Sequence, residues 1–247
     1  MQLLLEELKE THATSAGLKA FCTWNTLNII DQSRQACGGH GYSSYNGLPG
    51  LYNDFAVHCS WEGDNTILTL QLGRYLIQQG LAKEKGKVMP KGVTYLNELP
   101  SILSKKHKGA LTLQSISEAW HMVSAHAVNK AVQLYKSKLK DNVELAFEDT
   151  SFERFHAAKI HSTGYLYQRF YDAVQVIHGN DTVKTLMGKY CLLYGAYSII
   201  QVGSEFLSAN YYTASDLQEL TGLVTDLCAE LRREVIKTTD AFGYTVL

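Results

Sequence analysis

The chain has 247 residues, of which 45% are apolar and 19% charged, and its formal charge at pH 7 is −1. This length and composition predict one large or two modest globular domains with a real core, and they exclude a largely disordered chain. A charge so close to zero gives no reason to expect nucleic-acid binding, and no apolar run reaches the ~18 residues that a membrane span requires.

The first eighty residues predict helices separated by a loop. A helix is expected over about 3–34, followed by a loop through Gly50, a short helix or turn near Tyr52, and a helix over 66–80. Strand signals are nearly absent, since stretches such as 93–96 are too short to build a sheet. This part of the chain is therefore expected to be helical.

The stretch 82–112 is predicted to be a connection. It contains two of the three prolines and many lysines, and its mixed-charge run at 83–87 is typical of a solvated linker. Beyond it the chain has no proline, which permits long uninterrupted helices. Apolar residues recur at steps of three and four over 116–134 and 155–177, and further helices are expected over 182–207 and 215–242, with Ser215 as a candidate cap.

These patterns predict an all-α protein of two packed helical units, with residues 1–81 as the first, 82–112 as the linker and 113–247 as the second. The five cysteines form no CxxC pair, so free thiols in a reducing compartment are expected in place of a disulfide frame or zinc site. The histidine pairs at 121/126 and 156/161 are five residues apart, whereas a helical metal pair needs four, and no metal site is expected.

Two motifs carry the chemistry. Residues 35–42 read Gln-Ala-Cys-Gly-Gly-His-Gly-Tyr, and 61–66 read Trp-Glu-Gly-Asp-Asn-Thr at the start of an expected helix. The glycines leave room for a ligand, and an indole and a glycine beside Glu62 could desolvate its carboxylate and raise its basicity. Taken alone, Glu62 is more simply interpreted as an acid that complements the dipole of the helix that follows. Together the motifs suggest a flavin site with a carboxylate base.

The segment 14–76 closely resembles the C-terminal helical domain of peroxisomal acyl-CoA oxidases, which are flavoenzymes related to acyl-CoA dehydrogenases. The matching stretches are 16–21, 36–42 and 61–66, while 192–194 and 240–242 look like positions in the second helical domain of those oxidases. The resemblance implies a part of the dehydrogenase-like four-helix bundle followed by the second helical oxidase domain.

The resemblance also implies an activity. Glu62 would be the base that removes the proton alpha to the thioester of a fatty acyl-CoA, while the beta carbon gives a hydride to FAD. The product would be trans-2-enoyl-CoA, and O2 would reoxidise the flavin and yield hydrogen peroxide. Trp61, which replaces the family's Tyr or Phe, and Gly63 would border the substrate. Arg74 stands where related dehydrogenases carry an arginine near the base, although a helical arginine reaching solvent is an equal alternative.

For the cofactor, the resemblance places Gln35, Gly38 and Gly39 near the adenine and pyrophosphate of an FAD bound mainly to a partner subunit, which implies a homodimer. Asp64 and Thr66 match positions that approach the flavin nucleotide from the loop of the base.

The family's N-terminal helical domain and middle β domain are missing from this sequence, so a fragment, truncated form or divergent isoform is expected. A peroxisomal location is implied by resemblance only, because residues 244–247 lack a Ser-Lys-Leu address. Two alternatives stay open. One is an acyl-CoA dehydrogenase with a protein electron acceptor, which the extra helical domain after Lys91 argues against. The other is a catalytically silent helical module that dimerises or binds partners.

Overall fold

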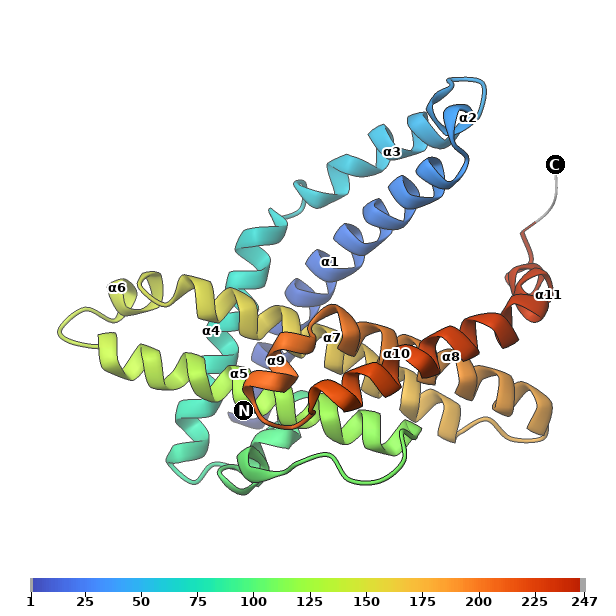
Figure 1. Ribbon diagram of the computed structural model, residues 1–247. Coiled ribbons are helices and arrows are strands. Elements are labelled where there is room, and N and C mark those ends of the chain that lie inside the picture. Colours follow the sequence, from blue (N-terminus) through green and yellow to red (C-terminus); the bar gives the residue numbers. More distant parts are fainter. Residues whose placement is uncertain (1, 245–247) are drawn as a thin grey trace. The chain divides into compact units, whose positions relative to one another are not determined.

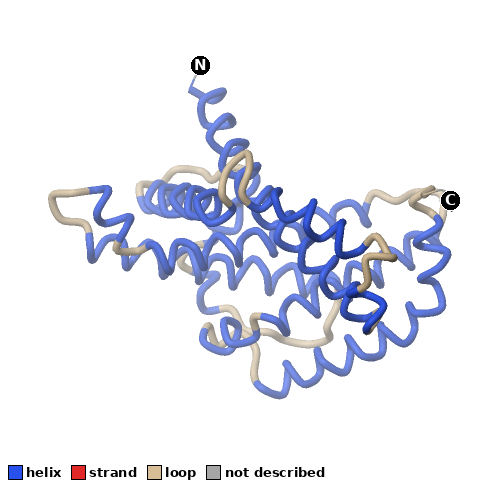
Figure 2. The backbone as a smooth tube through the Cα atoms, turned by 90° about the horizontal axis from the view of Figure 1, so that it is seen from above, coloured by secondary structure: helices blue, strands red, loops and turns tan. Residues whose placement is uncertain are grey.

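The computed structural model describes residues 2–244, and these form helices and connecting loops without a strand (Figures 1 and 2). The predicted all-α class is confirmed. The chain groups into two compact units, residues 1–98 with 127–162, and residues 99–126 with 163–247. Among the described residues, no helix is long and apolar enough to cross a membrane. The proposed domain limits at residues 81 and 113 stay a prediction.

The first unit is built around the contact between α1 and α4. Small buried residues at 13, 16, 17 and 20 repeat along one face of α1 and let the two helices approach closely. At Gly17 a Cβ atom would lie 2.3 Å from Cδ2 of Leu72, so a larger residue would displace this buried leucine. The elements of this unit are α1 (Gln2–Ala36), α2 (Gly39–Tyr42), α3 (Leu48–Ala56), η1 (Val57–Cys59), α4 (Asn65–Glu84), η2 (Lys91–Glu98), α6 (Val143–Glu148), and one part each of α5 (Leu113–Lys138) and α7 (Ser151–Gln175).

Part of the expected connection belongs to the core of this unit. Residues 84–88 are exposed, as a solvated linker would be, but Val93, Tyr95 and Leu96 in η2 are 1, 5 and 0% exposed. The carboxylate of Glu10 accepts the backbone N–H of Gly92 at 2.6 Å, which attaches η2 to α1. The burial of Val93, Tyr95 and Leu96 was not apparent from the sequence because η2 is too short to show a periodic pattern.

Tyr95 also contacts a buried histidine. Its hydroxyl lies 3.0 Å from Nδ1 of His161, which is 4% exposed, and burial lowers the pKa of His161 from 6.5 to about 4. The unfolded chain therefore takes up a proton as the pH falls below 6.5, while the folded chain does not until about pH 4.

Because the unfolded state gains this proton first, the protein should lose about 2 kcal/mol of stability between pH 7.5 and pH 5. Urea unfolding at the two pH values measures the loss. The variant His161→Gln, which keeps a hydrogen-bonding side chain but does not titrate, should show a much smaller difference. An equal loss in both proteins would remove His161 as its source.

The second unit has an aromatic core. Trp120 is 1% exposed and meets Phe206 edge-on, with ring centroids 5.5 Å apart. Gly195 leaves the space that the ring of Tyr167 occupies, since a Cβ there would lie 2.3 Å from Cε2 of that tyrosine. The elements are η3 (Ser101–Ser104), the remaining parts of α5 and α7, α8 (Asp181–Gln201), α9 (Gly203–Ser208), α10 (Ala214–Leu231), η4 (Arg232–Glu234) and α11 (Val235–Asp240).

Two helix predictions in this unit were wrong in detail. The expected helix 182–207 is interrupted at Val202, where a β-branched residue and Gly203, both weak helix formers, follow one another. The expected helix 215–242 is also divided, and its cap is Thr213, not Ser215. The Thr213 hydroxyl accepts the N–H of Asp216, whose carboxylate accepts the N–H of Thr213 in return, a reciprocal arrangement that satisfies two end groups. Residues 245–247, which lack the Ser-Lys-Leu type of peroxisomal address, lie outside the described residues.

Candidate functional site

The loop that carries Glu62 has an unusual backbone. Glu62 has a φ of +55° and Gly63 a φ of +113°. A left-handed conformation at a residue other than glycine costs on the order of 1 kcal/mol and persists only where its surroundings enforce it. The φ of Gly63 would strain any other residue, and a Cβ there would lie 2.9 Å from Cδ2 of Leu68, whose side chain would have to shift. Such strain is typical of functional sites.

Contacts from α1 enforce this conformation. The ammonium of Lys19 donates to the carbonyl of Gly63 at 2.7 Å and to Oδ1 of Asn65 at 2.8 Å. Asn65 is 1% exposed, and its Nδ2 donates to the hydroxyl of Thr23 at 2.8 Å and to the carbonyl of Ala20. The role of Lys19 was missed from the sequence, although it lies in the matching stretch 16–21.

Asp64 caps the helix that follows the loop. Its Oδ1 accepts the backbone N–H groups of Thr66 at 2.9 Å and Ile67 at 3.2 Å, which satisfies two of the free donors at the start of α4. Asp64 and Thr66 are therefore held beside Glu62, and both are exposed. Their expected contact with a flavin nucleotide stays a prediction.

Glu62 itself is exposed, and its neighbour does not cover it. The indole N–H of Trp61 donates to Nδ1 of His58 at 3.0 Å, and the two rings meet edge-on. Trp61 is 49% exposed. The expectation that the adjacent residues desolvate Glu62 was wrong for this chain, because Trp61 packs against His58. Groups from outside this chain would have to exclude water from the carboxylate.

The glycine block has an open side and a packed side. Gly38 has a φ of +59°, and Cβ atoms at Gly38 or Gly39 would meet nothing within 4 Å, so the backbone there is accessible to a ligand. At Gly41 a Cβ would lie 1.7 Å from the carbonyl oxygen of Arg34, which makes this glycine structural. The open backbone at 38–39 fits the close approach of a dinucleotide. The Gln35 amide beside it donates to Asp31 at 2.6 Å.

The two motifs lie at different places along α1. The loop of Glu62 is attached at Lys19, whereas the glycine block follows the end of α1. Gln35 is sixteen residues beyond Lys19 on this helix, which corresponds to about 24 Å along its axis. Figure 1 shows α2 at one end of α1 and the start of α4 part of the way along it. The two motifs therefore form separate parts of unit 1.

Arg74 forms an ion pair with a glutamate of α6. Its guanidinium donates two hydrogen bonds to the carboxylate of Glu144, at 2.7 and 2.6 Å, and lies 4.4 Å from the ring centre of Phe147. The hydrogen bonds from Arg74 lower the pKa of Glu144. The structure thus gives Arg74 a partner within the unit, and its expected substrate contact stays a prediction.

Comparison with known proteins identifies the family. A model described as "Acyl-CoA oxidase, C-alpha1 domain" matches residues 2–77, and one described as "Acyl-CoA oxidase" matches residues 112–245. The chain therefore belongs to the acyl-CoA oxidase family.

Relatives of this family cover nearly the whole chain. Acyl-coenzyme A oxidase 2 of Yarrowia lipolytica is 39% identical over 97% of this chain, and peroxisomal acyl-coenzyme A oxidase 1 of Bos taurus is 32% identical over 97%. The crystal structure of acyl-CoA oxidase 3 of Y. lipolytica superposes with a TM-score of 0.91 at 39% identity, covering 96% of this chain. These matches cover 35%, 38% and 35% of the relatives' own chains, so this chain spans about a third of their length.

Proposed function

We propose that this chain is the base-bearing C-terminal portion of an FAD-dependent acyl-CoA oxidase that converts a fatty acyl-CoA to its trans-2-enoyl-CoA. The observation that carries the proposal is the strained loop at Glu62, which Lys19 and Asn65 hold in place within a chain of this family. A carboxylate fixed in this way is suited to take a proton from one position of a bound substrate.

The chemistry assigned to Glu62 is abstraction of the proton alpha to the thioester. That C–H is only weakly acidic, so the base must be close to it and shielded from water. FAD, when bound, would supply the acceptor for the hydride from the beta carbon, and its reoxidation by O2 would give H2O2. Trp61 and Gly63 would border the acyl-CoA, and Arg74 would contact it after exchanging its ion pair with Glu144.

The cofactor would be held by two parts of the chain. Asp64 and Thr66 would approach the flavin nucleotide beside Glu62, and Gln35, Gly38 and Gly39 would approach the adenine and pyrophosphate. Because these groups lie in separate parts of unit 1, we propose that the glycine block serves the FAD of a second copy, which requires a homodimer. The word "peroxisomal" in the names of the relatives from Bos taurus and Mus musculus favours the peroxisome as the setting. Fatty acid β-oxidation is the process that we propose for the reaction.

On its own the chain is expected to behave as a helical module with little turnover. The exposure of Glu62 favours this second interpretation for the isolated chain, because nothing among the described residues excludes water from its carboxylate. A folded, colourless preparation would agree with it. The match to an acyl-CoA oxidase model over residues 112–245 disfavours a dehydrogenase with a protein acceptor.

The proposal can be tested in a chimaera in which this chain replaces the matching part of Y. lipolytica acyl-CoA oxidase 3. The purified chimaera should bind flavin and should release one H2O2 for each enoyl-CoA formed from a fatty acyl-CoA and O2. A flavin-loaded chimaera that reduces an artificial acceptor but makes no peroxide would point to the dehydrogenase alternative. One that does neither would contradict the assignment.

A further inference from the structure

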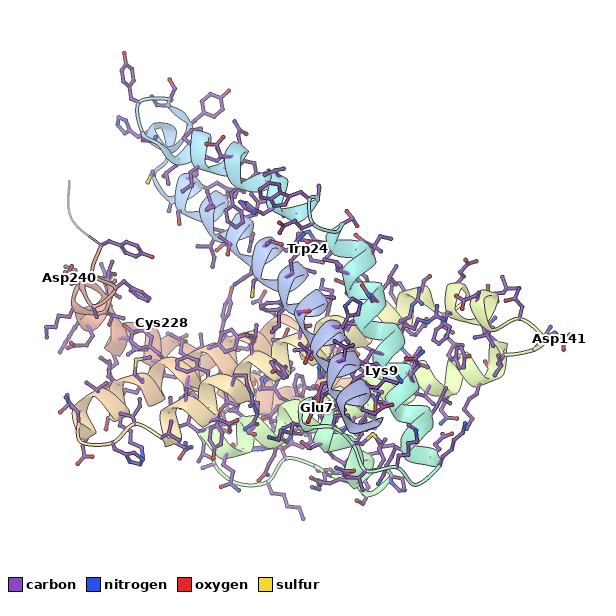
Figure 3. The ribbon with its side chains drawn as sticks, turned by 180° about the vertical axis from the view of Figure 1, so that it is seen from behind. Glu7, Lys9, Trp24, Asp141, Cys228 and Asp240 are labelled. Carbon is purple, nitrogen blue, oxygen red and sulfur yellow. The ribbon has the colours of Figure 1, made fainter. Side chains whose placement is uncertain are left out.

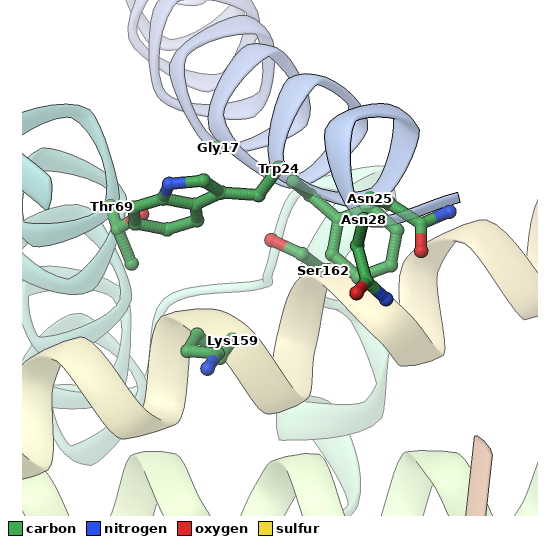
Figure 4. Close-up of a pocket in the computed structure, with 8 residues that line it drawn as sticks. Gly17, Trp24, Asn25, Asn28, Thr69, Lys159 and Ser162 are labelled. Atoms are coloured by element: carbon green, nitrogen blue, oxygen red, sulfur yellow. The ribbon is translucent and has the colours of Figure 1, made fainter. Parts of the chain in front are cut away.

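The first unit contains a pocket of about 300 Å³ that the proposed reaction does not use. Figure 4 shows side chains from α1, α4 and α7 around it. It shares no lining residue with the loop of Glu62 or with the glycine block. The residues that line it are Gly17, Phe21, Trp24, Asn25, Asn28, Thr69, Lys159 and Ser162.

The pocket follows from the spacing of side chains along α1. Gly17 brings α1 against Leu72 of α4, and the next residues on the same face, Phe21 and Trp24, are large. The two helices touch at the glycine, and the rings border the space beyond it. Trp24 lies on the middle part of α1 (Figure 3) and is fixed by an edge contact with Phe155, with ring centroids 6.2 Å apart. One wall of the pocket is therefore aromatic, and the contact with Phe155 holds the Trp24 ring of this wall in place.

Polar groups without partners face the same space. Ser162 is 5% exposed, its hydroxyl makes no hydrogen bond within residues 2–244, and Figure 4 shows this oxygen directed into the pocket. The side-chain amides of Asn25 and Asn28 likewise have no hydrogen-bond partner among the described residues. These groups reach the open pocket and can bond water there, so a ligand that supplies its own donors and acceptors could replace that water without loss of hydrogen bonds.

The charge of the lining favours an anion. Of the eight lining residues Lys159 is the charged one, and no carboxylate is among them. Its ammonium lies 5.8 Å from the ring centre of Phe155, next to the aromatic wall. An anionic group on a ligand could therefore approach Lys159 without meeting a like charge in the lining.

We propose that this pocket binds a bicyclic heteroaromatic ring that carries one anionic group. The ring would pack against Trp24 and Phe21, its polar atoms would meet Asn25, Asn28 and Ser162, and its anionic group would meet Lys159. A saturated chain would cover the amides and the hydroxyl without giving them partners. The volume limits the ligand to about two fused rings with a short substituent.

The test uses quinoline-3-carboxylate, its neutral isostere quinoline-3-carboxamide, and decanoate, each titrated into the full chain. Calorimetry gives the affinities, and the indole N–H signals in a ¹H–¹⁵N spectrum locate the ligand, because Trp24, Trp61 and Trp120 lie in three different environments. Single Trp→Phe variants assign the signals. The carboxylate should bind with a Kd on the order of 0.1 mM and shift the Trp24 signal alone.

Charge and shape are tested separately. The carboxamide and decanoate should each bind at least tenfold more weakly than the carboxylate, and Lys159→Met should weaken carboxylate binding about tenfold while leaving carboxamide binding unchanged. Lys130 is exposed on its helix as Lys159 is, so Lys130→Met serves as the matched control and should bind like the wild type. Absence of a Trp24 shift at millimolar carboxylate, equal binding of the three compounds, or an unaltered Lys159→Met variant would each overturn the proposal.

Discussion

Replacing Glu62 by glutamine in the Y. lipolytica chimaera is expected to reduce kcat for peroxide formation by at least about 10³-fold while flavin stays bound, because the amide cannot accept the substrate's alpha proton. The amide has nearly the size of the carboxylate, and the loop is held through the carbonyl of Gly63 and the side chain of Asn65, not through Glu62. The change should therefore leave the loop in place. Stopped-flow measurement of flavin reduction by acyl-CoA isolates the step in which the proton is lost.

Two comparisons make this result specific. Glu7→Gln removes an exposed carboxylate on α1, outside the loop of Glu62 (Figure 3), and should leave both kcat and flavin content unchanged. Flavin absorbance of each variant separates loss of the base from loss of the cofactor. If Glu62→Gln reduced its flavin as fast as the parent chimaera, Glu62 could not be the base.

Gly73→Ala should be among the most destabilising single-methyl changes in the chain. A Cβ at this position would lie 2.3 Å from the carbonyl oxygen and 2.4 Å from Cγ of Arg154, so α4 and α7 would have to move apart. Overpacking typically costs about 1–3 kcal/mol, and the contact with a backbone atom puts this change at the upper end, about 3 kcal/mol, which for a chain of this size lowers Tm by roughly 6–12 °C.

The matched control is Gly50→Ala in α3, where a Cβ would meet nothing within 4 Å. Alanine has the higher helix propensity, so this variant should be as stable as the wild type or slightly more stable. Differential scanning calorimetry of the two variants beside the wild type measures both effects. A Gly73→Ala variant that melts with the wild type would show that the α4–α7 crossing adjusts freely.

The long helices could be predicted from sequence because their apolar residues repeat at helical spacing over several turns, as in 116–134. Shorter elements could not. The six-residue helix α6 gives too few repeats to be recognised, and its start is set by the Asn142 side chain, which accepts the N–H groups of Glu144 and Leu145. The true cap of α10 depended on a reciprocal pair of hydrogen bonds that only the Thr213–Asp216 geometry reveals.

The residues of the candidate site could be predicted from the sequence, but the contacts that hold them in place could not. The residues 61–66 and 35–42 are contiguous, so the sequence alone marked them. The clamp from Lys19 joins residues 44 and 46 positions apart, and the ion pair between Arg74 and Glu144 joins residues 70 apart. Such contacts arise from helix packing, which no local pattern specifies. For the same reason the orientation of Trp61 toward His58, away from Glu62, was not foreseen.

Helices α5 and α7 each contribute to both compact units, and this has a practical consequence for how the protein can be divided. A cut within 82–112, where prolines and lysines suggest a natural boundary, would separate most or all of residues 1–98 from the 127–162 segment that completes their core. Both pieces should then expose apolar surface, aggregate on expression and resist refolding alone. When the two halves are co-expressed, we expect soluble protein only if both are present.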